Sequence, residues 1–211
     1  MVARTIQEFA KERGIRYLLH FTRLSNLKSI LTYGLVCRDR LGDGLVTGTV
    51  NDHHRLDRTD AVCVSIGFPN YRMFYRYQCD HPQEKWVVVA IQPKALWELR
   101  CAFCITNAAS NRVTAIPLIQ RTKLAAFQAM YDDYDDKVRA NLNLKDCLPT
   151  NPQAEVLMLD GVPARYIMGV AVPDVELKAQ LEARYPKLSV KKIESFFSFR
   201  SDYTHWQSPQ A

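Results

Sequence analysis

Short apolar segments through the middle of the chain limit most strongly what this sequence can fold into. Each is only a few residues long and lies between polar or proline-containing stretches, as buried strands do. The predicted strands are residues 61–66, 86–92, 100–105, 156–159 and 166–172, with shorter ones at 16–21, 35–37 and 188–193. The run at 86–92 is the clearest central strand, and Pro93 ends it.

Helical patterns flank these strands, mainly toward the two ends of the chain. The predicted helices are residues 5–13, 25–33, 69–77, 123–134 and 173–185. Thr5 and Glu8 form a capping-box pattern, and Gly14 and Gly34 close the first two helices. Because helices come early and late with strands between them, the sequence predicts an α+β fold rather than a doubly wound parallel sheet.

The length of 211 residues suits one domain, and the sequence has no internal repeats, low-complexity segment or persuasive linker. We therefore expect a single domain over residues 1–211. Residues 38–60 are polar and lack periodicity. A stretch of this length inside a compact domain is usually a functional or mobile loop, and we expect a loop for NAD and substrate there.

Charge and cysteine content bear on the partners of the protein and on the compartment in which it works. Lys and Arg number 28 against 22 Asp and Glu, a net charge of +6, which favours a polyanionic partner but also suits an ordinary basic protein. The one C-x-x-C pair, Cys101 and Cys104, lies among apolar residues, as packed thiols do, and no metal site is expected. Without a signal peptide or an apolar run of about 18 residues, we expect a reduced, cytoplasmic protein with no membrane anchor.

Two polar segments next to predicted strands could carry chemistry. Glu155 stands at the start of the strand at 156–159, and Gln153 is expected on the same side because side chains repeat every two residues. His20 and Thr22 end the strand at 16–21. Each also has a plain structural interpretation: Glu155 as a surface residue of an edge strand, and His20 as a hydrogen-bonded core histidine.

Four blocks resemble the DarT-type DNA ADP-ribosyltransferases in order and approximate spacing across residues 17–172. The first is a strand ending in His-x-Thr, followed by a helix with Asn-Leu and a closing glycine. The others resemble a Pro-x-x-x-Met-x-Tyr helix, a Thr-Asp-Gly-Asn-Ala loop that lacks Asp-Gly here, and a Gln-Ala-Glu strand. In this sequence the blocks are residues 20–35, 69–75, 106–110 and 153–157.

The resemblance implies an ADP-ribosyltransferase-like split central β-sheet with flanking helices. It implies NAD as co-substrate, no metal, and transfer of ADP-ribose to a base in single-stranded DNA with release of nicotinamide. Such enzymes are toxins with a macrodomain antitoxin, in toxin–antitoxin or phage-defence systems. The base, guanine or thymine, stays open, and a monomer is the default expectation.

The resemblance also assigns residues. It gives catalysis to Glu155 and Arg55, NAD binding to His20, Phe21, Thr22, Ser29, Arg55 and Tyr75, and substrate binding to Gln153 and Asn107. Chemistry supports Glu155, because a carboxylate stabilises the cation that forms on the ribose when nicotinamide leaves. Arg58 is the rival of Arg55. Either arginine is expected to orient phosphates and base rather than accept a proton, since its pKa is above about 12.

Two groups of aromatic and basic residues have less definite interpretations. Rings in the helix at 69–77 could stack on nicotinamide, although aromatic side chains at helical spacing are usually core: Tyr71, Phe74, Tyr75 and Tyr77. Basic and aromatic residues near the C-terminus could form a groove for single-stranded DNA or a solvated tail: Lys191, Lys192, Arg200, Tyr203 and Trp206.

Three other functions remain open. An RNA 2′-phosphotransferase shares the broad fold and uses NAD, but it has no Gln-x-Glu strand, so Glu155 argues against it. A protein-modifying ADP-ribosyltransferase is compatible with Gln-x-Glu. A catalytically inactive nucleic-acid-binding module would release no nicotinamide.

Overall fold

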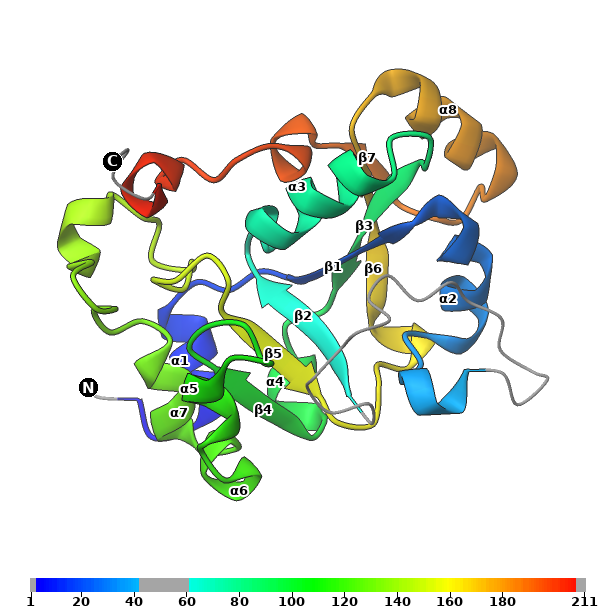
Figure 1. Cartoon of the computed structure of the whole chain (residues 1–211). Coiled ribbons are helices and arrows are strands. Elements are labelled where there is room, and N and C mark those ends of the chain that lie inside the picture. Colours follow the sequence, from blue (N-terminus) through cyan, green and yellow to red (C-terminus); the bar gives the residue numbers. More distant parts are fainter. Residues whose placement is uncertain (1–2, 42–60, 208–211) are drawn as a thin grey trace.

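A seven-stranded sheet forms the centre of the computed structural model, which describes residues 3–41 and 61–207 (Figure 1). The strand order is β4-β5-β2-β1-β3-β6-β7, and neighbours are antiparallel except for β6 and β7, which are parallel. The strands are β1 (Leu18–Arg23), β2 (Val62–Ile66), β3 (Trp86–Ile91), β4 (Cys101–Cys104), β5 (Glu155–Met158), β6 (Ile167–Val172) and β7 (Val190–Lys192).

Within the described residues, five helices are longer than one turn: α1 (Ile6–Glu12), α2 (Leu27–Tyr33), α3 (Tyr71–Asp80), α7 (Leu124–Ala129) and α8 (Val175–Arg184). Short helices are α4 (Ala95–Glu98), α5 (Asn111–Thr114) and α6 (Leu118–Arg121), with 3₁₀ turns η1 (Leu24–Asn26), η2 (Arg38–Arg40), η3 (Arg139–Leu142), η4 (Ala164–Tyr166), η5 (Glu194–Phe197) and η6 (Tyr203–Trp206). Thr5 and Glu8 make the predicted capping box on α1.

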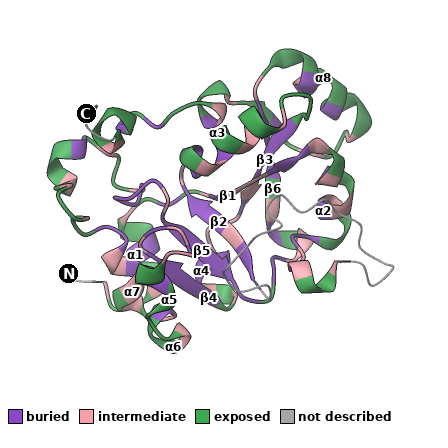
Figure 2. Cartoon of the chain, in the orientation of Figure 1, coloured by how far each residue is buried: buried purple, intermediate pink, exposed green. Residues whose placement is uncertain are grey.

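Helices cover both faces of the sheet, and the sheet itself is mostly buried (Figure 2). One face packs on α1, α2, α4, α7 and α8 in the largest apolar cluster. The other face has two smaller clusters, one under α3 and η5 and one under the segment that contains α5 and α6. Side chains of β1 to β6 alternate between these faces, so these strands help to hold both layers, whereas β7 contributes only Val190 to the largest cluster.

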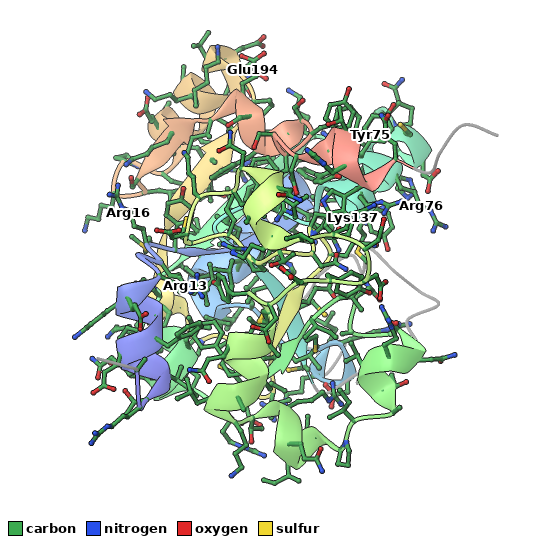
Figure 3. The ribbon with its side chains drawn as sticks, turned by 90° about the vertical axis from the view of Figure 1, so that its left-hand side faces the viewer. Arg13, Arg16, Tyr75, Arg76, Lys137 and Glu194 are labelled. Atoms are coloured by element: carbon green, nitrogen blue, oxygen red, sulfur yellow. The ribbon has the colours of Figure 1, made fainter. Side chains whose placement is uncertain are left out.

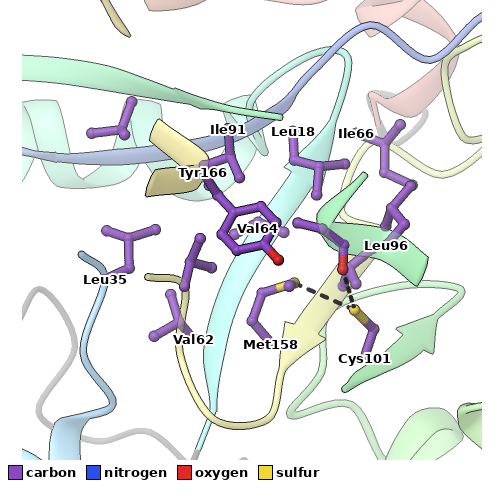
Figure 4. Close-up of a cluster of buried hydrophobic side chains, with 14 of the residues drawn as sticks. Leu18, Leu35, Val62, Val64, Ile66, Ile91, Leu96, Cys101, Met158 and Tyr166 are labelled. Carbon is purple, nitrogen blue, oxygen red and sulfur yellow. Dashed lines mark hydrogen bonds between the residues drawn. The ribbon is translucent and has the colours of Figure 1, made fainter. Parts of the chain in front are cut away.

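The largest cluster is densely packed around β2 and β5 (Figure 4). Val64, Val156 and Met158 are at most 1% exposed there. The Cys101 thiol contacts the carbonyl oxygen of Ala95 at 3.4 Å and the sulfur of Met158 at 3.7 Å. Burial raises the pKa of the Cys101 thiol to about 12, so this group acts as an apolar, protonated core side chain.

The sheet is split between β1 and β2. These strands pair at two positions, Leu18 with Ile66 and Leu19 with Ser65, whereas β1 pairs with β3 over all six of its residues. Beyond that contact β1 and β2 separate in Figure 1. The predicted α+β fold with a split central sheet is therefore confirmed.

Some predicted elements differ from the structure. Residues 35–37 are not a strand, because only Leu35 pairs, in an isolated bridge with Val162. The helix predicted at 123–134 ends at Ala129, and the single-turn helices α4, α5 and α6 were not predicted. A single turn carries too little periodicity to be recognised from sequence. Among the described helices, none combines the length and hydrophobicity needed to cross a membrane.

Candidate active site

Glu155 is the first residue of β5, and its side chain is buried. The strand lies between β4 and β2, so it is an interior strand. Glu155 is only 4% exposed. The interpretation of Glu155 as a surface residue of an edge strand is therefore wrong. A buried carboxylate requires hydrogen-bond donors to offset the loss of water.

Two donors from distant segments hold the two oxygens of this carboxylate. The Asn70 side-chain amide donates to Oε1 at 3.3 Å, and the backbone N–H of Ala108 donates to Oε2 at 2.8 Å. Bonds to a charged acceptor are stronger than neutral ones and fix its direction. The carboxylate is thus oriented before any substrate arrives, which is the condition for electrostatic stabilisation of a developing cation.

Asn70 combines this contact with a structural task. Its Oδ1 accepts from the backbone N–H of Met73 and so caps α3, and its own N–H donates to the Ser65 hydroxyl. Sequence reasoning assigned no role to Asn70. An asparagine directly before a helix is a recognisable capping signal, but nothing local indicates that its amide reaches Glu155.

The segment 106–110 supplies the second donor through a turn. Asn107 Oδ1 accepts from the N–H of Ala109 at 3.0 Å, which directs the N–H of Ala108 to Glu155. The turn forms although the family's Asp-Gly is missing. Asn107, predicted to bind substrate, is half-buried beside Glu155 and shapes this turn; the structure does not test a contact with substrate.

Gln153 does not continue the strand. Residues 151–153 form a turn in which Asn151 Oδ1 accepts from the N–H of Gln153 at 2.8 Å. The expectation that Gln153 and Glu155 share a face by strand alternation is therefore wrong, because alternation holds only within a strand. Gln153 is half-buried, two residues before the carboxylate. Its predicted contact with the base stays a prediction.

His20 and Thr22 lie on β1 at the split in the sheet. The Nδ1 of His20 lies 2.9 Å from the carbonyl oxygen of Cys63 on β2. A carbonyl only accepts, so Nδ1 carries the proton, and Nε2 of a neutral ring is an acceptor. Thr22 is buried, and its hydroxyl accepts from the Asn26 side chain at 3.0 Å. Since β2 lies between β1 and β5, His20 and Glu155 flank the same strand.

The other residues predicted to bind NAD lie in different surroundings. Ser29 is half-buried on α2. Phe21 stacks on Phe74, with ring centroids 4.5 Å apart, within the aromatic cluster under α3. Tyr75 is 53% exposed on the outer side of α3, and its ring packs on Phe199. The structure thus places Tyr75 away from the buried end of α3, where Asn70 meets Glu155.

The remaining aromatic residues of α3 belong to the core. Tyr71 and Phe74 are buried, and Tyr77 is half-buried against Trp86. Arg55 and its rival Arg58 lie outside the described residues. In residues 3–41 and 61–207, no group of three His, Cys, Asp or Glu side chains is arranged to hold a metal ion.

The C-terminal segment packs against the chain just upstream of Glu155. Arg200 is 3% exposed and donates to the carbonyl oxygens of Pro149 and Thr150. Its guanidinium also pairs with Asp202 at 2.6 Å, and Trp206 Nε1 donates to the same carboxylate. The idea that Arg200 lines a DNA groove is therefore wrong, because all three nitrogen atoms of its guanidinium donate hydrogen bonds inside the protein. Lys191 and Lys192 are exposed on β7.

The split, mostly antiparallel sheet with a fixed, buried glutamate at a strand start is similar to the ADP-ribosyltransferase class of fold. The chain belongs to the DarT family, the ssDNA thymidine ADP-ribosyltransferases, whose family model matches residues 19–198. No match was found among curated proteins.

Solved structures of DarT proteins have a fold similar to that of this chain. Thermosipho africanus DarTG in complex with ADP-ribose has a TM-score of 0.60 at 19% identity over 86% of this chain. The chain spans about half of that protein, 51% of its length. Thermus sp. 2.9 DarT matches over 98% of its length in complex with NAD+ (TM-score 0.53, 17% identity, 87% of this chain). Its complex with ADP-ribosylated ssDNA matches over 97% (TM-score 0.56, 16% identity, 88% of this chain).

Proposed function

We propose that this protein transfers ADP-ribose from NAD to a thymidine base in single-stranded DNA and releases nicotinamide. The observation that carries the proposal is Glu155, a buried carboxylate held by Asn70 and Ala108 at a strand start in a DarT-family chain. The likeness to Thermus DarT structures with NAD+ and with ADP-ribosylated ssDNA supports both substrates.

Glu155 acts on the ribose next to nicotinamide. As the bond between nicotinamide and ribose breaks, positive charge develops at the anomeric carbon and the ring oxygen. The fixed carboxylate stabilises this charge without reorganising and accepts a hydrogen bond from the ribose 2′-hydroxyl. Asn70 and Ala108 are positioning groups, because they hold the carboxylate and do not touch the reacting atoms.

NAD binding is assigned to the residues at the split of the sheet. His20 is assigned to a hydroxyl or amide group of NAD, and the contact of its Nδ1 with the Cys63 carbonyl oxygen orients the ring. Thr22 on the same strand and Ser29 on α2 are assigned to NAD as well. Arg55, with Arg58 as its rival, pairs with the pyrophosphate through its planar guanidinium.

Thymine leaves one choice of nitrogen. N1 is bonded to the deoxyribose, so N3 attacks the anomeric carbon; a bond from N3 to that carbon forms, nicotinamide leaves, and the N3 proton is released. N3 lies on the Watson–Crick edge and is paired in duplex DNA, which explains a single-stranded substrate. Gln153, two residues before Glu155, and Asn107, next to the Ala108 that donates to Glu155, are assigned to the base.

The biological setting follows from the activity. Modification of DNA bases would be toxic, and we propose a cytoplasmic toxin, active as a monomer and controlled by a macrodomain antitoxin that removes the mark. Co-expression of such an antitoxin should restore growth of cells that express the protein. Growth that stays arrested despite an active macrodomain would contradict this partner.

The first experiment measures nicotinamide release from NAD with purified protein, together with the mass of a thymidine-containing oligonucleotide. Wild-type protein should add one ADP-ribose, and Glu155→Gln should lower kcat roughly 10²- to 10³-fold, as removal of an electrostatic stabiliser does. Glu12→Gln, the same change on the exposed side of α1, is the matched control.

Other outcomes are equally informative. An active Glu155→Gln protein would show that the catalytic assignment is wrong. Consumption of NAD without a DNA product would indicate a protein or RNA acceptor. A failure to consume NAD with any acceptor would indicate an inactive binding module.

A further inference from the structure

Three partly exposed aromatic rings lie together on the surface formed by α3 and the C-terminal segment. Phe199 is 42% exposed and Tyr203 is 36% exposed, and their rings stack with centroids 5.0 Å apart. Tyr75 lies 5.1 Å from Phe199, and the buried Tyr71 meets Phe199 edge-on from below. We call Tyr75, Phe199 and Tyr203 the aromatic platform. Figure 3 shows Tyr75 between α3 and the C-terminal ribbon.

Basic side chains border the aromatic platform. Arg72, Tyr75 and Arg76 are all exposed and follow the helical spacing of one face of α3. Arg76 is 81% exposed and makes only a loose pair with Asp80, at 3.6 Å. Between residues 198 and 207 the carboxylate is Asp202, which is buried against Arg200 and adds no exposed negative charge there.

Both halves of the aromatic platform are fixed to the candidate active site. The cap of α3, Asn70, contacts Glu155, and Tyr75 follows five residues later, about 7.5 Å along the helix axis. In the other half, Arg200 follows Phe199 directly and bonds the carbonyl oxygens of Pro149 and Thr150, just upstream of Glu155. The rings therefore have a fixed position relative to the catalytic carboxylate, on the exposed surface outside the buried contact of Asn70 with Glu155.

We propose that the aromatic platform stacks the bases that flank the target thymidine in single-stranded DNA, while Arg72 and Arg76 contact the phosphates. This inference rests on the proposed function and names where the rest of the strand binds. Every base offers a flat face, so stacking on exposed rings next to cations is suited to a strand of varied sequence. The platform does not take part in the chemical step.

The test compares steady-state kinetics of Tyr75→Ala and Tyr203→Ala on an oligonucleotide that extends on both sides of the thymidine. The KM for DNA should rise roughly 5- to 150-fold for each lost stacking contact. For Tyr203→Ala the kcat and the KM for NAD should not change, and for both variants the defect in DNA binding should shrink as the oligonucleotide is shortened. Tyr75→Phe and Tyr203→Phe keep the rings and should behave as wild type.

The arginines give an independent readout. Arg72→Gln with Arg76→Gln should make DNA binding less dependent on salt, with the slope of log K against log salt falling by about 0.7 for each lost phosphate contact. Arg184→Gln, on the exposed side of α8, is the control and should leave the slope unchanged.

The two proposals fail in different ways. If the wild-type protein makes no ADP-ribosylated DNA, the proposed function fails. If the wild type is active and Tyr75→Ala and Tyr203→Ala keep the wild-type KM for long DNA, the aromatic platform is not a DNA site, and the proposed function stands. Thermal melts check that each variant folds. If Tyr203→Ala does not fold, the kinetics of Tyr75→Ala alone test the aromatic platform, because Tyr75 is the more exposed residue and its loss should disturb the fold less.

Discussion

Individual residues gain their role here from partners far away in sequence. Glu155 meets Asn70, 85 residues upstream, and Ala108, 47 residues upstream. The partners differ in kind, since Asn70 contributes a side chain and Ala108 contributes only its backbone. A change at Asn70 can therefore test how much the orientation of the carboxylate matters, whereas a side-chain change at Ala108 leaves its N–H in place.

Asn70→Ser should separate the cap of α3 from the support of Glu155. Serine can still cap the helix, so the melting temperature should stay close to that of the wild type. The lost bond to a charged acceptor, typically about 1.5–3 kcal/mol, should lower kcat roughly 10- to 100-fold with little change in the KM for NAD.

Asn70→Ala is the companion variant and should also lose about 1 kcal/mol of stability together with the cap. Steady-state kinetics and urea unfolding distinguish the two effects. A wild-type kcat in Asn70→Ser would mean that Asn70 does not position Glu155.

At the scale of elements, two contacts between distant segments fix the chain on either side of β5, the strand that carries Glu155. Gly34 ends α2 as predicted, at a φ of +85°, and a Cβ there would lie 2.1 Å from the Val162 carbonyl oxygen, so this position requires glycine. The C-terminal segment is fastened by Arg200 to residues 149–150. That segment is part of the support of β5 and not a solvated tail.

Asp202→Asn should destabilise the protein because it leaves the buried Arg200 guanidinium without its counter-charge. The expected loss in the free energy of unfolding is about 3–5 kcal/mol, typical of a broken buried pair. Asp160→Asn is the matched control, since Asp160 pairs with Arg100 at 3.2 Å on an exposed surface, and its loss should cost no more than about 1 kcal/mol. Urea unfolding measures both, and equal losses would contradict a dominant role for the buried pair.

At the scale of the whole molecule, buried acidic groups that stay protonated predict how stability depends on pH. Burial raises the pKa of Cys101 to about 12 and also raises the pKa of Tyr131. In the unfolded chain these groups ionise near pH 8.5 and 10. The unfolded state therefore loses protons first, and the stability that these groups contribute at neutral pH is lost as the pH rises.

Stability should accordingly fall above about pH 9, by about 1.4 kcal/mol per pH unit for each such group between its unfolded and folded pKa. Urea unfolding from pH 7 to 11 measures this slope. Cys101→Ala removes the thiol, the group with the lower unfolded pKa, and should therefore reduce the loss of stability just above pH 9. Identical slopes for Cys101→Ala and wild type would show that the thiol is not held protonated.

The sequence by itself determined the α+β class, most strands and helices, and the position of Glu155 at a strand start, because local periodicity and caps encode these features. Even the two loose blocks at 69–75 and 106–110 proved to contain the partners of Glu155. Only the tertiary structure decided that Asn70 and Ala108 hold its carboxylate, that Arg200 is buried, and that Tyr75 faces Phe199. Those contacts depend on how the sheet and helices pack. They join residues far apart in sequence, and no local sequence pattern predicts such contacts.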